Sequence, residues 1–240
     1  MNASNDLLAV VVDADNVPSS RIGAVLAEVA RFGTASVKRV YGDWTSTQLN
    51  GWKLAANEHA IQPMQQFAHT TGKNSTDSAL IIDAMDLLYT GRFQGFCIVS
   101  SDSDFTRLAS RIREQGVTVY GFGERKTPVS FRNACDQFTY LDILGGNDNV
   151  PAAVTPTPKA LARTSPQDDA RLMEGLRDSV NTASLEDGWS NLATVGHLLR
   201  KRQPDFDSRN WGYAKLSDLF RASGEFVVEG SMVRLAPAPR

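Results

Sequence analysis

The segment LLAVVVDADN, residues 7–16, determines the fold of the first half of the chain. Its six apolar residues run without interruption up to Asp13, and such a run is typical of a strand buried on both faces of a parallel sheet. Asp13 stands where this strand ends. In open α/β sheets ligands bind beyond the carboxyl ends of the strands, so Asp13 is the first candidate site residue.

Strand-like runs alternate with helical patterns beyond this segment. Ile22, Val25 and Val29 recur at the spacing of a helix that buries one face. The same reasoning predicts strands over 36–41, within 60–67, and over 96–99, 117–122 and 138–144, and helices over 77–89 and 105–113. The alternation predicts an α/β fold, namely a Rossmann-like, mostly parallel sheet with helices on both faces and 138–144 as an edge strand.

The composition excludes several classes of protein. Of 240 residues, 25 are basic and 27 acidic, so the chain is neither a polybasic nucleic-acid coat nor an acidic tail protein. Cys97 and Cys135 lack the spacing of a disulfide framework or a thiolate zinc site. No apolar run approaches the roughly 18 residues of a membrane span, and the N-terminal run lacks a basic flank. We therefore expect a cytoplasmic protein without a membrane partner.

The composition changes after Leu144. Residues 146–167 are rich in proline and alanine and nearly devoid of large apolar side chains, which is typical of a linker. Apolar residues then recur at helical spacing in three groups: Leu172, Leu176 and Val180; Val195, Leu198 and Leu199; and Tyr213, Leu216, Leu219 and Phe220. Two short runs, Phe226–Val228 and Met232–Leu235, flank a turn and predict a hairpin. We expect a first domain over 1–145, a linker over 146–167, and a small winged helix-turn-helix domain over 168–240.

Four aspartates fall at positions that an open parallel sheet brings together. Asp13 follows the first strand, and Asp102 and Asp104 follow the strand over 96–99. Asp77 opens the predicted helix over 77–89. Carboxylates a few ångströms apart raise one another's pKa, so the cluster requires protons or cations. Oxygen ligands suit Mg²⁺ or Mn²⁺, and such an ion serves phosphoryl transfer. The pattern predicts a Mg²⁺ or Mn²⁺ site for phosphodiester hydrolysis, with the four aspartates as catalytic residues and metal ligands.

Each of these acids also has an ordinary structural interpretation. Asp77 can offset the macrodipole of the helix that it opens, and Asp102 or Asp104 can cap the helix over 105–113. The location of all four acids on one side of the sheet favours the catalytic interpretation. Asp15 is adjacent to the cluster, but the direction of its side chain stays open.

Other polar side chains in the same predicted loops are candidate substrate-binding residues. Asn16, Ser100 and Ser101 are neutral hydrogen-bonding groups that can orient a water or a phosphate oxygen. Lys73 stands four residues before Asp77 and can contact a polyanion.

Three segments of the first half carry a family resemblance. They read VVVDADNV at 10–17, GKNSTDSALIIDAMDLL at 72–88 and VSSDSDF at 99–105. In this order and spacing they resemble the NYN domains of the PIN-like nuclease superfamily. The resemblance implies a Rossmannoid sheet and an acidic, metal-binding site for RNA cleavage. It also implies Asp13, Asp77, Asp102 and Asp104 as metal-site acids and Asn16 as their polar partner.

The second half resembles another known module. The segments VGHLLRKRQPDFDSRNWGYAKLSDLF at 195–220 and FVVEGSMVRL at 226–235 are similar to the OST-HTH or LOTUS domain, a winged helix associated with RNA binding. Its candidate substrate-binding residues are the basic run Arg200, Lys201 and Arg202 together with Lys215. Cations and aromatics interleave nearby, at Arg209, Trp211, Tyr213 and Arg221, and such rings can stack on bases. Packing of these rings in the core is the competing interpretation.

Three functions compete on these observations. The leading one is a metal-dependent endoribonuclease whose C-terminal domain binds the RNA. The alternative is a non-catalytic adaptor that retains the nuclease fold and binds RNA or a protein partner through the C-terminal domain. A third is a phosphatase with Asp13 as nucleophile and Asp15 as acid, although Asn16 and Val17 depart from the pattern of such enzymes. An open sheet with an apolar edge also allows two copies to pair as a homodimer.

Overall fold

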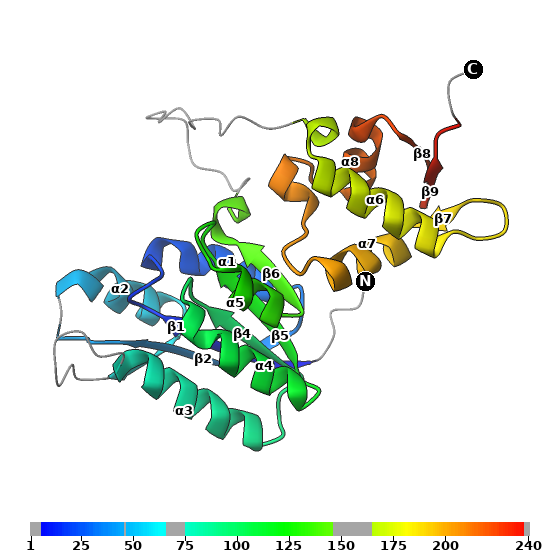
Figure 1. Ribbon diagram of the computed structural model, residues 1–240. Helices are drawn as coiled ribbons and strands as arrows, with labels where there is room; N and C mark the ends of the chain where they lie inside the picture. The colour runs from blue at the N-terminus through cyan, green and yellow to red at the C-terminus, as the bar shows by residue number, and fades with distance from the viewer. Residues whose placement is uncertain (1–5, 46, 66–74, 146–164, 238–240) are drawn as a thin grey trace, which may run out of the picture. The chain divides into compact units, whose positions relative to one another are not determined.

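The computed structural model describes residues 6–45, 47–65, 75–145 and 165–237. The chain divides into two compact units, Met1–Gly146 and Asn147–Arg240 (Figure 1). Each unit has hydrophobic core residues of its own. Most of the predicted linker over 146–167 lies outside the described residues, and so does Lys73.

In the described part of the first unit, six parallel strands form one sheet in the order β3-β2-β1-β4-β5-β6. They are β1 (Leu7–Asp13), β2 (Thr34–Gly42), β3 (Gln62–Gln65), β4 (Gly95–Val99), β5 (Thr118–Gly123) and β6 (Gln137–Tyr140). β1 lies inside the sheet because its apolar run tolerates burial on both faces. The strand order reverses between β1 and β4, which is the place where open α/β sheets bind ligands.

Helices cover both faces of this sheet, as Figure 1 shows. They are α1 (Ile22–Val29), α2 (Asn50–Glu58), α3 (Ser75–Tyr89), α4 (Thr106–Glu114) and α5 (Val129–Ala134), with short 3₁₀ turns η1 (Ser19–Arg21), η2 (Thr47–Leu49), η3 (Ser103–Phe105) and η4 (Leu141–Ile143). α1 and α2 pack on one face, and α3, α4 and α5 pack on the other. The predicted α/β architecture is confirmed.

The side chains of β1 join two separate cores. Ala9 and Val11 pack with the core under α3, α4 and α5, whereas Val10 and Val12 pack with the core under α1 and α2. This division follows from the alternation of side chains along a strand. None of these four side chains has exposed surface, and full burial of one valine contributes about 1.5–3 kcal/mol. A strand that is covered by helices on both faces therefore requires a continuous apolar run such as this one.

Two features of the first unit differ from the sequence prediction. The strand expected over 138–144 ends at Tyr140, because the chain turns through η4 to bury Leu141 and Leu144 on the opposite face. Helices α2 and α5 were not predicted. Both are short, and α2 buries only Trp52 and Ala56, so neither shows a clear helical stripe in the sequence.

The second unit combines helices with a small antiparallel sheet. As far as the structure describes it, it contains η5 (Pro166–Asp168), α6 (Ala170–Ala183), α7 (Leu192–Arg202), η6 (Ser208–Trp211) and α8 (Leu216–Ser223), with strands β7 (Ser190–Asn191), β8 (Phe226–Glu229) and β9 (Met232–Leu235). The strand order is β7-β9-β8, and the predicted hairpin is β8 with β9. Tyr213 lies before α8 rather than inside it, because Gly212 takes a left-handed conformation (φ 87°) that ends η6.

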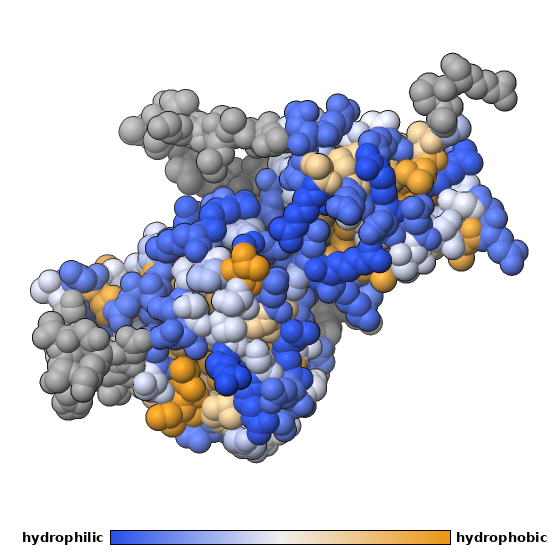
Figure 2. Space-filling view, in the orientation of Figure 1, coloured by the Kyte–Doolittle hydropathy of each residue, from blue (hydrophilic) through white to orange (hydrophobic). Residues whose placement is uncertain are grey.

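The surface on the side shown in Figure 2 is mostly hydrophilic, with small separate hydrophobic areas. Large apolar side chains that are well exposed include Ile82, Tyr89 and Leu185. Within the described ranges, no helix is both long enough and apolar enough to cross a membrane. Cys97 and Cys135 are buried free thiols.

Candidate metal centre

The predicted acids lie around the point where the strand order reverses. Asp13 is the last residue of β1, and Asp102 and Asp104 follow the neighbouring strand β4. Asp77 lies in the first turn of α3. Three separate elements therefore bring these carboxylates to one edge of the sheet.

Three of the four predicted acids form a close cluster. Asp77, Asp102 and Asp104 each offer one carboxylate oxygen, and these oxygens lie within 4.8 Å of one another. Asp77 and Asp102 are partly buried and Asp104 is exposed. An all-oxygen donor set of this kind fits a hard divalent cation such as Mg²⁺ or Mn²⁺, which completes its coordination with water.

The electrostatics of Asp77 show how closely the acids approach. Its pKa is raised from the ordinary value of 3.8 to about 6, firstly by burial and secondly by the charge of Asp13. The charges of Asp102, Asp104 and Asp15 raise it further, in that order. A second charge is costly in this place, and a bound cation would remove the repulsion.

Asp13 lies beside the trio and is held by hydrogen bonds. Its side chain has no exposed surface. Oδ2 accepts from Asn16 Nδ2 at 2.7 Å and from Ser100 Oγ at 2.8 Å, and Oδ1 accepts the backbone N–H of Asp15 at 3.1 Å. Three donors satisfy a buried carboxylate without an ion. A nucleophile must reach its substrate, so this burial does not favour the phosphatase with Asp13 as nucleophile.

Ser100 connects the end of β1 to the loop after β4. Its hydroxyl donates to Asp13 and accepts the backbone N–H of Asp102 at 3.1 Å. Like Asp13 it has no exposed surface. The sequence placed Ser100 and Asn16 among the substrate-binding candidates; in the structure their side chains bind Asp13, so both fix the geometry of the acidic edge.

The capping interpretation also holds in part. Asp102 is the N-cap of η3, and its Oδ1 accepts the backbone N–H of Asp104 at 2.9 Å. Asp77 lies in a first helical turn, where the macrodipole favours negative charge. Capping uses one oxygen of Asp102, and the other remains available for a ligand. The two interpretations therefore coexist at this residue.

Ser101 and Gly123 fix the contact between the loop after β4 and the end of β5. Ser101 Oγ accepts the backbone N–H of Glu124 at 2.9 Å, and the residue is 7% exposed. A Cβ on Gly123 would lie 2.6 Å from the Ser100 carbonyl oxygen and 2.6 Å from Thr127 Oγ1. β5 therefore approaches the loop after β4 at a distance that only glycine permits. Sequence reasoning missed Gly123, whose one signal is its place at the end of a strand.

Asp15 contributes more than the sequence indicated. Its pKa is raised, chiefly by burial and then by the charge of Asp13, while a hydrogen bond with the Thr76 side chain opposes the shift. Asp43 raises the same pKa from the end of β2. The acidic edge thus extends from the trio through Asp15 to Asp43, and the pair of aspartates around Ala14 was its only signal in the sequence.

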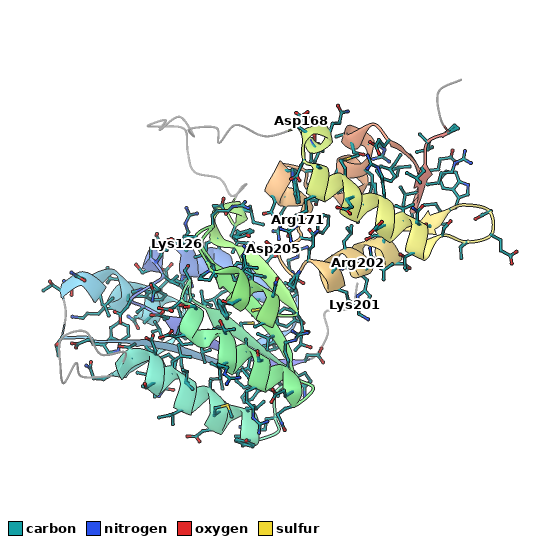
Figure 3. All side chains as sticks on the ribbon, in the orientation of Figure 1. Lys126, Asp168, Arg171, Lys201, Arg202 and Asp205 are labelled. Carbon is teal, nitrogen blue, oxygen red and sulfur yellow. The ribbon has the colours of Figure 1, made fainter. Side chains whose placement is uncertain are left out.

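The basic candidates of the second unit lie at the end of α7 and the start of α8. Figure 3 labels Lys201 and Arg202, which together with Arg200 form the exposed last turn of α7. Arg202 donates to Asp178 at 3.4 Å and to Thr182 at 3.2 Å on α6, whereas Lys215 is exposed at the N-cap of α8. The exposed basic side chains of the second unit can therefore contact a polyanion.

The interleaved cations and aromatics are largely engaged within the unit. Arg209 Nη2 donates to Asp207 Oδ2 at 2.7 Å, and the two side chains are 25% and 17% exposed. Trp211 donates Nε1 to Asp169 at 3.2 Å. Trp211 and Tyr213 are partly buried and pack against the core of the unit. The core interpretation accounts for most of their surface.

Comparison with known proteins assigns both units. The model of the NYN domain family matches residues 7–142, and that of the OST-HTH/LOTUS domain matches residues 169–232. No curated protein matches the chain.

Two solved structures are similar to parts of the chain. A protein of unknown function from Vibrio parahaemolyticus is 16% identical over 58% of this chain and 96% of its own, with a TM-score of 0.48. An uncharacterized protein from Nitrosomonas europaea, solved by NMR, is 34% identical over 38% of this chain and 96% of its own, with a TM-score of 0.27. On the family matches, the chain belongs to the NYN domain family and carries an OST-HTH/LOTUS domain after its NYN domain.

Proposed function

We propose that the protein is a metal-dependent endoribonuclease that hydrolyses RNA phosphodiester bonds at the acidic edge of the NYN domain. The observation that carries this proposal is the trio of Asp77, Asp102 and Asp104, whose oxygens lie within 4.8 Å of one another at the reversal of the sheet. Membership in the NYN family supports a nuclease, and the OST-HTH/LOTUS domain supports a nucleic-acid substrate.

We propose two roles for the residues of the acidic edge: some would bind the ion, and others fix the loops that carry those ligands. Asp77, Asp102 and Asp104 would bind Mg²⁺ or Mn²⁺. A bound ion of this kind activates water and neutralises charge on a scissile phosphate. Asp13 lies next to them, and its hydrogen bonds with Asn16 and Ser100 hold the loops after β1 and β4 together.

RNA contacts are proposed on both units. In the NYN domain the candidates are Asn16, which is partly buried beside Asp13, and Lys73, which lies outside the described residues. On the OST-HTH/LOTUS domain the candidates are Arg200, Lys201, Arg202 and Lys215. Exposed cations without base contacts bind the phosphate backbone in a salt-dependent way.

A cleavage assay with matched variants tests the proposal. The wild-type chain with Mn²⁺ or Mg²⁺ should cut labelled single-stranded RNA, and Asp102→Asn should abolish the cutting. Asparagine is also a good N-cap, so this variant keeps η3 while removing the charge. Asp86→Asn, on the exposed side of α3, is the control and should cut normally. Equal cutting by wild type and Asp102→Asn would reject the assignment.

The adaptor is the second candidate, and one observation favours it. Asp13 is satisfied by protein donors and Asp102 is used as a cap, so part of the acidic edge has a structural role without any ion. The adaptor predicts RNA binding that survives Asp77→Asn and Asp104→Asn, and no cleavage product with any divalent ion. Isothermal titration of the wild type with Mn²⁺ separates the two, because the adaptor predicts weak binding or none.

A further inference from the structure

A groove lies next to the acidic edge, between α2 and the edge strand β3. Its volume is about 670 Å³, which is within the range of small-ligand sites. The lining includes Trp44, Lys53, Asn57, Ile61, Pro63 and Gln65. The walls are thus an aromatic ring, apolar surface and a few polar groups.

Hydrogen bonds fix the position of the Trp44 ring. Its indole Nε1 donates to the Met64 carbonyl oxygen of β3 at 2.9 Å, and its backbone N–H donates to Gln65 Oε1 at 3.1 Å. The ring packs against the core on one side and is only partly buried. With its polar edge satisfied, Trp44 offers the groove a rigid flat surface for stacking.

The rim on α2 is polar and positively charged. Lys53 and Asn57 are four residues apart, so they lie on the same face of the helix, and both are exposed. Among the described residues, Lys53 has no carboxylate partner. A cation on the rim of an apolar groove suits an anionic ligand that has a flat apolar part.

Direct contacts join this groove to the acidic edge. Gln65 Nε2 donates to Asp43 Oδ1 at 3.1 Å, and Asp43 immediately precedes Trp44. Asp43 follows the end of β2, and Tyr41 of that strand pairs with Asp13 at the end of β1. The groove and the proposed metal site therefore lie along one continuous edge of the sheet, at the ends of β3, β2 and β1.

We propose that this groove binds an unpaired base of the RNA, stacked on Trp44, while Lys53 contacts the phosphate next to that base. The proposal rests on the ribonuclease function and adds a base-binding subsite beside the acidic edge. Bases inside a duplex are stacked on one another and cannot enter such a groove, whereas bases of single strands stack readily on aromatic side chains. The groove would then hold the strand while its backbone crosses the acidic edge.

Two variants at one position test the stacking. Trp44→Leu and Trp44→Phe both lose the hydrogen bond to Met64, but only phenylalanine keeps a ring. In the full chain with Asp102→Asn, we expect Trp44→Leu to weaken binding of a short single-stranded RNA about tenfold and Trp44→Phe to retain most of the affinity. Fluorescence anisotropy measures both, and circular dichroism checks that the two variants fold alike. Equal affinities of the two variants would overturn the proposal.

RNAs with single abasic positions provide a second measurement. At the position that occupies the groove, removal of the base should weaken wild-type binding as much as Trp44→Leu does. The two changes together should cost no more than either alone, because they remove one interaction. Full additivity at every position would overturn the proposal.

A 4-thiouridine crosslink does not depend on variants. We expect the crosslink within residues 44–65, and its absence there would contradict the groove. Failure of this proposal is distinguishable from failure of the ribonuclease function: RNA cutting with no effect of Trp44→Leu rejects the groove alone, and base-dependent binding without cutting rejects only the enzyme.

Discussion

Asp77 carries an electrostatic cost that can be measured on the protein without metal. Its pKa is about 6 in the fold and 3.8 ordinarily, so between these pH values the folded state binds more protons than the unfolded state. Stability therefore falls as the pH rises through this window. Asp77→Asn should raise the free energy of unfolding in EDTA at pH 7 by about 1–2 kcal/mol, allowing for solvent screening.

The pH dependence of this gain identifies its cause. The gain from Asp77→Asn should shrink as the pH falls from 6 to 4 and disappear below about pH 3, where the carboxyl group is protonated in both the folded and the unfolded chain. Urea unfolding at several pH values measures it, and Asp86→Asn on the exposed side of the same helix should show no such window. A gain that is independent of pH would point to helix propensity instead.

At the residue scale, the sequence predicted where the acidic residues lie better than it predicted which groups they bind. Residues directly after apolar runs end up at the carboxyl ends of strands, and this rule placed Asp13, Asp102 and Asp104. The rule cannot tell that Ser100 binds Asp13 or that Asp15 bonds with Thr76, because these contacts depend on loop conformation and side-chain rotamers. The proposed division of roles among the acids came from the structure.

At the element scale, the contact between β5 and the loop after β4 predicts a sensitive glycine. In Gly123→Ala the new methyl group would lie 2.6 Å from the Ser100 carbonyl oxygen, which is backbone and cannot rotate away. We expect a loss of about 1–3 kcal/mol in the free energy of unfolding, and a loss of Mn²⁺ affinity because the loop that carries Asp102 shifts.

A second glycine provides the control for this prediction. Gly175 lies within α6, and a Cβ there would be 3.5 Å from the nearest atom outside the helix, which is an ordinary contact. Gly175→Ala should therefore stabilise the chain by about 0.5–1 kcal/mol through helix propensity. Chemical denaturation of both variants checks the opposite signs. A stable Gly123→Ala variant with normal Mn²⁺ affinity would contradict the proposed tight approach.

The length of each helix and the number of residues it buries explain which elements could be predicted from the sequence. α4 buries Leu108, Ala109 and Ile112 on one side, and such a stripe is visible in a linear sequence. α5 has six residues and α2 buries two, so their periodicity is too short to detect. The early end of β6 depends on which face Leu141 and Leu144 join, and that is a property of the assembled layers.

At the scale of the whole molecule, metal should stabilise one unit and not the other. Each unit has core residues of its own, so calorimetry of the full chain should resolve two transitions. Free Mn²⁺ at about 100 times its Kd should stabilise the NYN domain by about 2.7 kcal/mol and leave the other transition unchanged. EDTA or Asp102→Asn should abolish the shift. A shift of both transitions, or of neither, would argue against the trio as the binding site.

The exposed end of α7 predicts a salt-dependent contribution from the second unit. Lys201→Gln should weaken binding of single-stranded RNA and reduce the slope of log K against log salt by about 0.7, since one phosphate contact is lost. Arg202→Gln should do less, because its guanidinium is already bonded to Asp178 and Thr182. Anisotropy titrations of the Asp102→Asn chain at several salt concentrations measure both. Equal slopes for Lys201→Gln and its parent would exclude this contact.

The double coverage of β1 constrains how this molecule can vary. From Leu8 to Asp13 every side chain is buried, and neighbouring residues belong to opposite layers. A substitution in the strand must be accommodated by one of two packed interiors, so the strand has little mutational freedom. The side chains at the acidic edge vary more easily in the loops after β1, β2 and β4 and in the first turn of α3, where a change need not repack either interior.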